Sequence, residues 1–265
     1  MLTFPNIDPV AFQIGPLKVR WYGLMYVFGF VGGYFLVRWL AEKRKVELPK
    51  DALQEMISYL AIGVIVGGRL GYVLFYNLPF YLSHPLEVFA VWHGGMSFHG
   101  GLLGALLMGW WFTKRRGLPF YQVVDLFAVA APIGLGLGRI GNFINGELYG
   151  RPTSVPWAMI FPQGGPVARH PSQLYEAFLE GLVLFLILLG LSKRVRAEGV
   201  LFWTFVGGYG LARFFVEFFR EPDPQLGLVL GPFSMGQMLS LLMILISALF
   251  LVAKRVTFPP KDALV

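Results

Sequence analysis

The segment from residue 134 to residue 150 holds the densest group of chemically useful side chains in an otherwise apolar chain. Arg139, Asn142, Asn145 and Glu147 stand there among glycines at positions 134, 136, 138, 141, 146 and 150. Glycine allows other groups to approach the backbone closely, and a guanidinium holds phosphate through a rigid fork of donors. We therefore expect this segment to bring a phosphate-binding arginine and a carboxylate to one place.

Two other interpretations of these glycines are weaker. The spacing Gly136-x-Gly138-x-x-Gly141 matches a dinucleotide-binding fingerprint, but it follows an apolar run where that fingerprint requires a strand. Glycine-mediated helix packing explains the glycines, yet it leaves the polar side chains between them unexplained.

Ionisable side chains also occur inside long apolar runs, where each costs about 2.5–3.5 kcal/mol to insert into a membrane. They are Arg69, Asp125, Glu176, Glu180, Arg213 and Glu217, with His99 and Arg139 at the ends of such runs. Tyr209, Arg213 and Glu217 are spaced four apart, which places them on one helix face. The spacing fits an Arg–Glu pair that holds helices together, and it also fits an anion site.

The depth of the arginines favours the anion site. At a rise of about 1.5 Å per residue, Arg213 lies roughly 9 Å below Phe219 at the end of its apolar run, and Arg69 lies similarly deep below Phe75. We expect a cavity that faces the outer leaflet of a membrane. The nearest plentiful phosphate there belongs to an anionic phospholipid headgroup.

His99 is the first candidate for a general base, because the pKa of an imidazole lies close to neutral pH. Ser97, His99 and Asp125 together would suggest a hydrolase triad. Ser97 lacks a nucleophile turn, however, and we expect Asp125 near the opposite membrane face. The chain has no cysteine and no helix-spaced set of metal ligands, so the sequence predicts no metal and no cofactor.

Membrane-spanning helices must position these residues. Hydrophobic residues make up 56% of the 265-residue chain and charged residues 14%, whereas soluble proteins are close to a quarter charged. A span needs about 20 apolar residues. The sequence predicts an all-α, polytopic integral membrane protein, a single transmembrane domain over residues 1–265. Its helices are expected near 20–41, 53–75, 97–113, 120–138, 174–192, 200–219 and 234–253.

Basic clusters predict the orientation, because Lys and Arg accumulate on the cytoplasmic side. The clusters follow the first, third, fifth and seventh spans, and they comprise Lys43, Arg44, Lys45, Lys50, Lys114, Arg115, Arg116, Lys193, Arg194, Arg196, Lys254, Arg255 and Lys261. We therefore expect a periplasmic N-terminus and a cytoplasmic C-terminus. The net charge of +7 then reflects topology, and no nucleic-acid partner is expected.

Two outer connections are too rich in proline and aromatic residues for plain loops. Residues 76–96 include Pro79, Pro85 and Trp92, which predicts an arm lying in the membrane interface. Residues 139–173, between the fourth and fifth spans, combine many turn formers with Trp157 and Phe161. We expect this second segment to form a packed periplasmic head loop.

Together these stretches resemble one bacterial family, the prolipoprotein diacylglyceryl transferases, over essentially the whole chain. The resemblance rests on residues 21–26, 67–77, 94–103, 138–147 and 169–176, and on the segment from Tyr209 to Arg220. The run Gly-Arg-Ile-Gly-Asn-Phe-Ile-Asn-Gly-Glu at 138–147 resembles the family's signature.

The resemblance implies an enzyme of the bacterial inner membrane that carries out the first step of lipoprotein maturation. Its substrates would be phosphatidylglycerol and the lipobox cysteine in the signal peptide of a preprolipoprotein, and glycerol phosphate would be released. The implied functional residues are His99, Arg139, Asn142, Glu147, Gly150 and Arg213, with Tyr22 and Tyr209 in support. Arg139 would bind the lipid phosphate.

This reaction suits the residues available. The substrate thiol, with a pKa near 8.5, would attack the glycerol carbon with help from a base. His99 is the first candidate for the base and Glu147 the second, while Arg139 and Arg213 would stabilise charge on the departing phosphate. We expect Tyr22, Tyr209, Asn142, Gly150, Arg69 and Glu217 to complete the substrate site, which would face the outer leaflet.

Two alternatives from other classes are a transporter of anions or lipids, and a structural scaffold. A transporter would use the same buried arginines, but it would also need polar groups in the inner half of the membrane, where the sequence offers little besides Asp125. A scaffold would tolerate alanine at His99 and Arg139.

Overall fold

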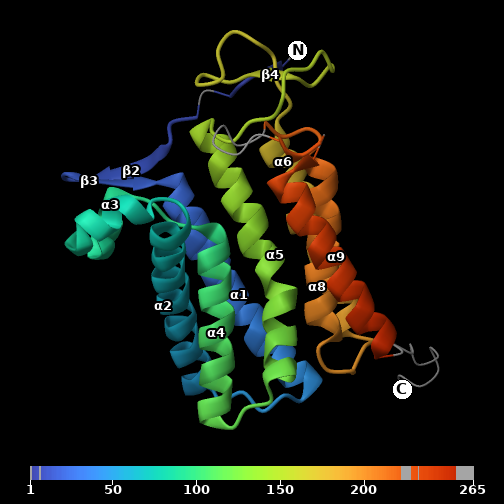
Figure 1. Cartoon of the computed structure of the whole chain (residues 1–265). Helices are drawn as coiled ribbons and strands as arrows, with labels where there is room; N and C mark the ends of the chain where they lie inside the picture. Colours follow the sequence, from blue (N-terminus) through green and yellow to red (C-terminus); the bar gives the residue numbers. More distant parts are fainter. Residues whose placement is uncertain (1, 6, 222–227, 232, 255–265) are drawn as a thin grey trace. The chain divides into compact units, whose positions relative to one another are not determined.

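The computed structural model describes residues 2–5, 7–221, 228–231 and 233–254, and these are mostly helical (Figure 1). Arg255 and Lys261, which belong to the last predicted basic cluster, lie outside the described residues. The chain divides into two compact units. The first unit comprises Met1–Trp39 and Asp125–Val265, and the second comprises Leu40–Val124.

Each predicted span coincides with a helical segment. These segments are α1 (Trp21–Arg44), α2 (Lys50–Phe75), α4 (Phe98–Arg116), α5 (Phe120–Asn145), a continuous helix over Ser172–Ser192, α8 (Val200–Val216) and α9 (Met235–Ala253). Within the described residues, five helices are long and apolar enough to cross a membrane: α1, α2, α5, Ser172–Ser192 and α9. The prediction of a helical, multi-pass membrane protein is therefore supported, while a count of seven spans and their orientation stay predictions.

In the second unit, α2 and α4 pack at very short range through glycines (Figure 1). A Cβ on Gly67 would lie 2.3 Å from the carbonyl oxygen of Gly100, and one on Gly104 would lie 2.1 Å from that of Gly63. Small residues at such spacing let two membrane helices touch backbone to backbone. The segment that connects α2 to α4 in the sequence is the predicted arm. It contains α3 (Leu78–Ser83) and two 3₁₀ turns, η1 (Pro85–Phe89) and η2 (Val91–His93).

In the first unit, α5 extends further than predicted. It ends at Asn145, where the sequence suggested 138, so residues 139–145 are helical instead of belonging to the loop that follows. Two of its glycines are contact points, in line with the close approach that the sequence predicts: a Cβ on Gly136 would lie 3.1 Å from the Cα of Gly181, and one on Gly141 would lie 2.8 Å from the Tyr22 ring. Close packing thus accounts for glycine at positions 136 and 141 of this helix.

The Ser172–Ser192 helix has three parts: α6 (Ser172–Glu176), a π-helical stretch η3 (Ala177–Val183) and α7 (Leu184–Ser192). Such π-helical stretches are frequent at functional sites. After it, α8 and α9 run side by side (Figure 1). Helix α9 starts with a capping box, in which Ser234 and Gln237 exchange hydrogen bonds with each other's backbone.

Short strands add to the helical architecture outside the long helices. A hairpin joins β2 (Val10–Ile14) to β3 (Leu17–Arg20), β1 (Leu2–Thr3) pairs in parallel with β4 (Met159–Ile160), and β5 (Leu228–Leu230) pairs with β6 (Phe233–Ser234). Backbone bridges also connect Pro152 and Met159 to Arg169. Ala158 and Phe161, in the connection between α5 and α6, are fully buried. The connection between α5 and α6 is therefore packed, with its own small core.

Candidate functional site

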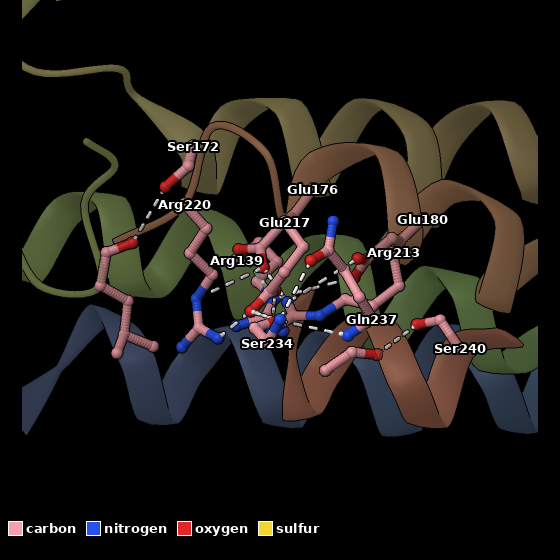
Figure 2. A network of polar contacts seen from close by, with 12 residues as sticks. Arg139, Ser172, Glu176, Glu180, Arg213, Glu217, Arg220, Ser234, Gln237 and Ser240 are labelled. Carbon is pink, nitrogen blue, oxygen red and sulfur yellow. Dashed lines mark hydrogen bonds and ion pairs between the residues drawn. The ribbon is translucent and has the colours of Figure 1, made fainter. Parts of the chain in front are cut away.

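Six charged side chains meet in the first unit and form a buried cluster of three arginines and three glutamates (Figure 2). Arg139 comes from α5, Glu176 from α6, Glu180 from η3 and Arg213 from α8, and Glu217 and Arg220 follow the end of α8. Glu176 and Glu180 are fully buried, and Glu217 is 4% exposed. Such burial costs several kcal/mol per ion unless opposite charges are paired, and here the formal charges of the six side chains balance.

Glu176 is shared by two arginines that come from different helices. Arg139 Nε lies 3.3 Å from Glu176 Oε2, and Arg213 Nη1 forms an ion pair with Glu176 Oε1. Glu180 lies slightly further away, with Oε2 at 3.9 Å from Arg139 Nε and Oε1 at 4.0 Å from Arg213 Nη1. One carboxylate therefore holds the guanidinium groups of α5 and α8 next to each other.

A second set of contacts links the cluster to α9. Arg213 Nη2 lies 2.9 Å from Glu217 Oε2, which confirms the pair that the four-residue spacing predicts. Glu217 Oε1 accepts a hydrogen bond of 2.9 Å from Ser234 Oγ, the capping residue of α9. Arg220 Nη1 lies 3.9 Å from Glu217 Oε2. The start of α9 thus fixes the glutamate that orients Arg213.

Glu147 stands at the turn that follows α5, held by two amides. Its Oε1 accepts hydrogen bonds from Asn142 Nδ2 at 2.9 Å and from Asn145 Nδ2 at 3.0 Å. Its backbone carbonyl accepts one from Gln173 Nε2 at 2.6 Å, which joins the turn to α6. The Tyr22 ring packs against Gly141, and its hydroxyl lies 3.0 Å from that of Tyr26. The sequence run 138–147 therefore delivers Arg139 to the charge cluster and Glu147 to an adjoining polar turn.

Gly150 occupies a position that has no room for a side chain. A Cβ there would lie 2.3 Å from the carbonyl oxygen of Phe219 and 2.7 Å from the Cβ of His170. The Gly150 amide donates to the carbonyl of His170 at 2.8 Å, and Gly150 forms a backbone bridge with Arg220. Gly150 thus acts through the backbone, by packing the head loop onto the segment that carries Arg220.

His170 lies beside this contact and outside the predicted spans. Its Nδ1 lies 3.1 Å from the hydroxyl of Tyr175, and its ring packs against Phe219. Burial lowers the pKa of His170 below the ordinary value for histidine. The neutral imidazole is therefore the form favoured in the folded protein.

The structure distributes the predicted site residues over both units. Arg139, Asn142, Glu147, Gly150, Arg213, Glu217, Tyr22 and Tyr209 belong to the first unit. Tyr209 precedes Arg213 by one turn on α8, and its ring lies beside that of Phe205. His99 and Arg69 belong to the second unit. His99 is the second residue of α4, and its side chain lies outside the described part of the structure.

Comparison with known proteins shows which family the chain resembles. The family model for prolipoprotein diacylglyceryl transferase matches residues 9–253. A phosphatidylglycerol–prolipoprotein diacylglyceryl transferase of Geobacter sulfurreducens is 63% identical over 245 residues, which cover 92% of this chain and 94% of the relative. Proteins of the same name from Nitratidesulfovibrio vulgaris and Pseudomonas paraeruginosa are 53% and 54% identical, over 93% and 92% of this chain and 94% and 92% of their own lengths.

The chain belongs to the prolipoprotein diacylglyceryl transferase family. The resemblance inferred from the motifs is confirmed. Within this member of the prolipoprotein diacylglyceryl transferases, the run from Gly138 to Glu147 spans the last part of α5 and the turn beyond it.

Three members of the charge cluster are absent from the predicted site: Glu176, Glu180 and Arg220. The sequence does contain a pattern that indicates two of them: Glu176 and Glu180 are four apart within an apolar run and so share a helix face. Buried arginines also require counter-charges. In the described residues, no group of three or more His, Cys, Asp or Glu side chains has an arrangement that could hold a metal ion.

Proposed function

We propose that this protein transfers the diacylglyceryl group of phosphatidylglycerol to the thiol of the lipobox cysteine in preprolipoproteins and releases glycerol phosphate. The observation that carries the proposal is the junction of Arg139 and Arg213 on Glu176. Arg139 and Glu176 lie on helices long and apolar enough to cross a membrane, and Arg213 lies on the shorter apolar helix α8. The printed names of the relatives, which specify phosphatidylglycerol and prolipoprotein, support the choice of substrates.

The arginines form the accessible edge of the cluster. The side chains of Arg139 and Arg213 are 19% and 12% exposed, whereas those of Glu176 and Glu180 are 0% exposed. An incoming anion therefore meets guanidinium groups before it meets carboxylates. Two guanidinium groups side by side suit the oxygens of a phosphodiester, because each presents a planar set of donors.

The reaction is a displacement at the carbon of the diacylglyceryl group that is bonded to a phosphate oxygen. The thiol sulfur forms a bond to this carbon, the carbon–oxygen bond breaks, and its electron pair leaves with the phosphate oxygen. Arg139 and Arg213 stabilise the charge that accumulates on the leaving group, and losing one such donor typically costs about 10²–10³ in rate. Tyr22, Tyr209, Asn142 and Gly150 complete the substrate site, and Glu217 orients Arg213.

A general base takes the thiol proton. His99 is the first candidate, since an imidazole accepts protons near neutral pH. Glu147 is the second, because the amides of Asn142 and Asn145 hold its carboxylate in a defined orientation. The thiol that accepts the diacylglyceryl group belongs to the substrate, so the reaction requires no cysteine in this chain, and the sequence has none.

We place the protein in the bacterial inner membrane, with seven spans, a periplasmic N-terminus and a site that opens to the outer leaflet. The candidate spans and the basic clusters of the sequence support this orientation. In it, residues 76–96 lie in the interface and the connection between α5 and α6 forms the periplasmic head.

The transporter alternative requires polar groups in the inner half of the membrane, where Asp125 is the main one in the sequence. Asp125 accepts hydrogen bonds from the amides of Gly199 at 2.9 Å and Phe202 at 2.8 Å, at the start of α8. These contacts satisfy donors that a helix start leaves open. Asp125 thus has a structural role that does not require a transported ion.

The direct test combines purified protein in detergent, phosphatidylglycerol and a synthetic lipobox peptide. We expect the peptide to gain the mass of a thioether-linked diacylglyceryl group while glycerol phosphate appears in equal amount. A peptide with serine in place of the cysteine serves as the control and should remain unmodified. Movement of intact lipid in proteoliposomes, without glycerol phosphate, would favour the transporter and contradict the proposal.

A further inference from the structure

Arg69, like Arg139, directly follows a glycine in the sequence, yet the structure gives it a different environment from Arg139. Its side chain is buried, with 4% of the residue exposed. Nε donates to the carbonyl of Val88 at 2.9 Å. Nη1 donates to Gly94 and, at 3.2 Å, to Gly95, and Nη2 donates to Glu87 and, at 3.0 Å, to Ala90.

These contacts use the full donor capacity of the side chain. A guanidinium carries five N–H groups, and Arg69 makes a hydrogen bond to each of five backbone carbonyls between residues 87 and 95. Arg69 Cζ also lies over the Tyr81 ring, 5.2 Å from its centroid. In this conformation Arg69 is committed to the protein backbone and has no donor to offer a lipid phosphate.

The segment that Arg69 holds leads directly into α4. Gly94 and Gly95 both have positive φ, at 83° and 79°, and a Cβ on Gly95 would lie 2.6 Å from the Tyr72 ring. The Ser97 amide then donates to the carbonyl of Gly68, the neighbour of Arg69, at 2.8 Å. Ser97 Oγ accepts from the Gly100 amide at 3.2 Å and so caps α4.

His99 follows two residues after this cap. Its backbone position is therefore set by the same contacts that join residues 87–97 to the outer end of α2. The region is tied from three directions: by the Arg69 guanidinium, by the Tyr72 ring and by the carbonyl of Gly68. A catalytic group tolerates little displacement, since a shift of about 1 Å can cost about 10²-fold in rate.

We propose that Arg69 is a positioning residue, which clamps the segment before α4 and thereby places His99 for catalysis. This inference rests on the proposed function, because it takes His99 as the base. It replaces the expectation that Arg69 binds substrate, and it predicts that Arg69 affects turnover through His99 and leaves lipid affinity unchanged.

The test begins with Arg69→Lys, since a lysine has three donors for five carbonyls. With phosphatidylglycerol and a lipobox peptide, we expect kcat to fall about 10- to 100-fold while KM for the lipid changes less than about twofold. Amide hydrogen exchange should accelerate in residues 94–101. Gly95→Ala perturbs the same segment without removing any Arg69 donor, and it should reproduce this pattern if Arg69→Lys does not fold.

A double-mutant cycle then tests the link to His99. In single-turnover measurements that detect residual activity, Arg69→Lys should add less than about twofold to the loss caused by His99→Gln, because coupled residues are non-additive. The matched control is Arg115→Lys, at the opposite end of α4, where Arg115 stacks on the Trp111 ring. This variant should retain wild-type kcat and exchange rates.

Three results separate the possible failures. A rise in KM for phosphatidylglycerol with unchanged kcat would show that Arg69 is a lipid ligand after all. Unchanged amide exchange in residues 94–101, or full additivity with His99→Gln, would overturn the clamp. Near-normal turnover of His99→Gln alone would instead refute the base assignment in the proposed function, independently of what exchange shows for Arg69.

Discussion

Arg139 on α5 and Arg213 on α8 share the carboxylate of Glu176 on α6, Arg139 through Nε at 3.3 Å from Oε2 and Arg213 through an ion pair with Oε1. Three helices thereby meet at one charge. The guanidinium groups keep some exposure while the carboxylate has none, so the junction presents positive charge outward and keeps its negative charge inside.

The first prediction concerns the geometry of phosphate binding by Arg139. Arg139→Lys should lose nearly as much activity as Arg139→Ala, about 10²–10³-fold, because an ammonium cannot form the bidentate contact of a guanidinium. Arg194→Lys, at an exposed position after α7, is the control and should remain active. Turnover of Arg139→Lys close to wild type would show that charge alone suffices.

The second prediction concerns Glu176 and stability. Glu176→Gln removes the buried charge that two partly exposed arginines share, and breaking a buried ion pair costs up to about 3–5 kcal/mol. We expect a clear drop in the free energy of unfolding, measured in detergent by thermal or denaturant unfolding. Glu47→Gln, at an exposed position between α1 and α2, should leave that free energy unchanged. Equal stability of the two variants would mean that the cluster is not held by Glu176.

The third prediction separates the two candidate bases. If His99 takes the thiol proton, the rate should rise with pH between about pH 5 and pH 8, the range in which an imidazole loses its proton. His99→Gln should abolish this rise, whereas Glu147→Gln should preserve it at a lower rate. A flat profile of the wild-type protein between about pH 5 and pH 8 would exclude an imidazole base.

The fourth prediction concerns Gly150. Gly150→Ala places a methyl group against the carbonyl of Phe219, a backbone atom that cannot rotate away, so we expect the head loop to separate from the segment bearing Arg220. Both activity and stability should fall, the latter by about 1–3 kcal/mol. Gly190→Ala in α7 is the matched control and should be neutral or stabilising, because beyond the helix's own nearby backbone no described atom lies within 4 Å of the new methyl group.

The fifth prediction uses the lowered pKa of His170. Between the lowered pKa of His170 and about pH 6.5, the unfolded chain binds a proton at this histidine and the folded protein does not. The free energy of unfolding should therefore fall as the pH drops through this window. His170→Gln should remove this part of the pH dependence. His84→Gln, at an exposed position, should leave it intact. A pH dependence that persists without His170 would assign it to other groups.

Much of this protein could be predicted from local sequence. Apolar runs place the helices, because in a membrane a backbone must satisfy its hydrogen bonds within the segment. The four-residue spacing of Arg213 and Glu217 predicts their ion pair, since both lie on one face of a helix. The run from Gly138 to Glu147 carries much of the resemblance to the family, and the family model matches residues 9–253.

Other features depend on tertiary structure. Glu176 joins Arg139 to Arg213 only because Gly136 and Gly181 let α5 and η3 approach closely, and such long-range proximity has no local pattern. The course of α5 beyond residue 138 is a second case: Gly136 packs against Gly181 and Gly141 against the Tyr22 ring, and the helix ends at Asn145, directly before Gly146 with its φ of 68°. The environment of Arg69 is the clearest case. Its sequence context is like that of Arg139, but five backbone carbonyls surround it, and carbonyls are common to all residues and therefore leave no trace in the sequence.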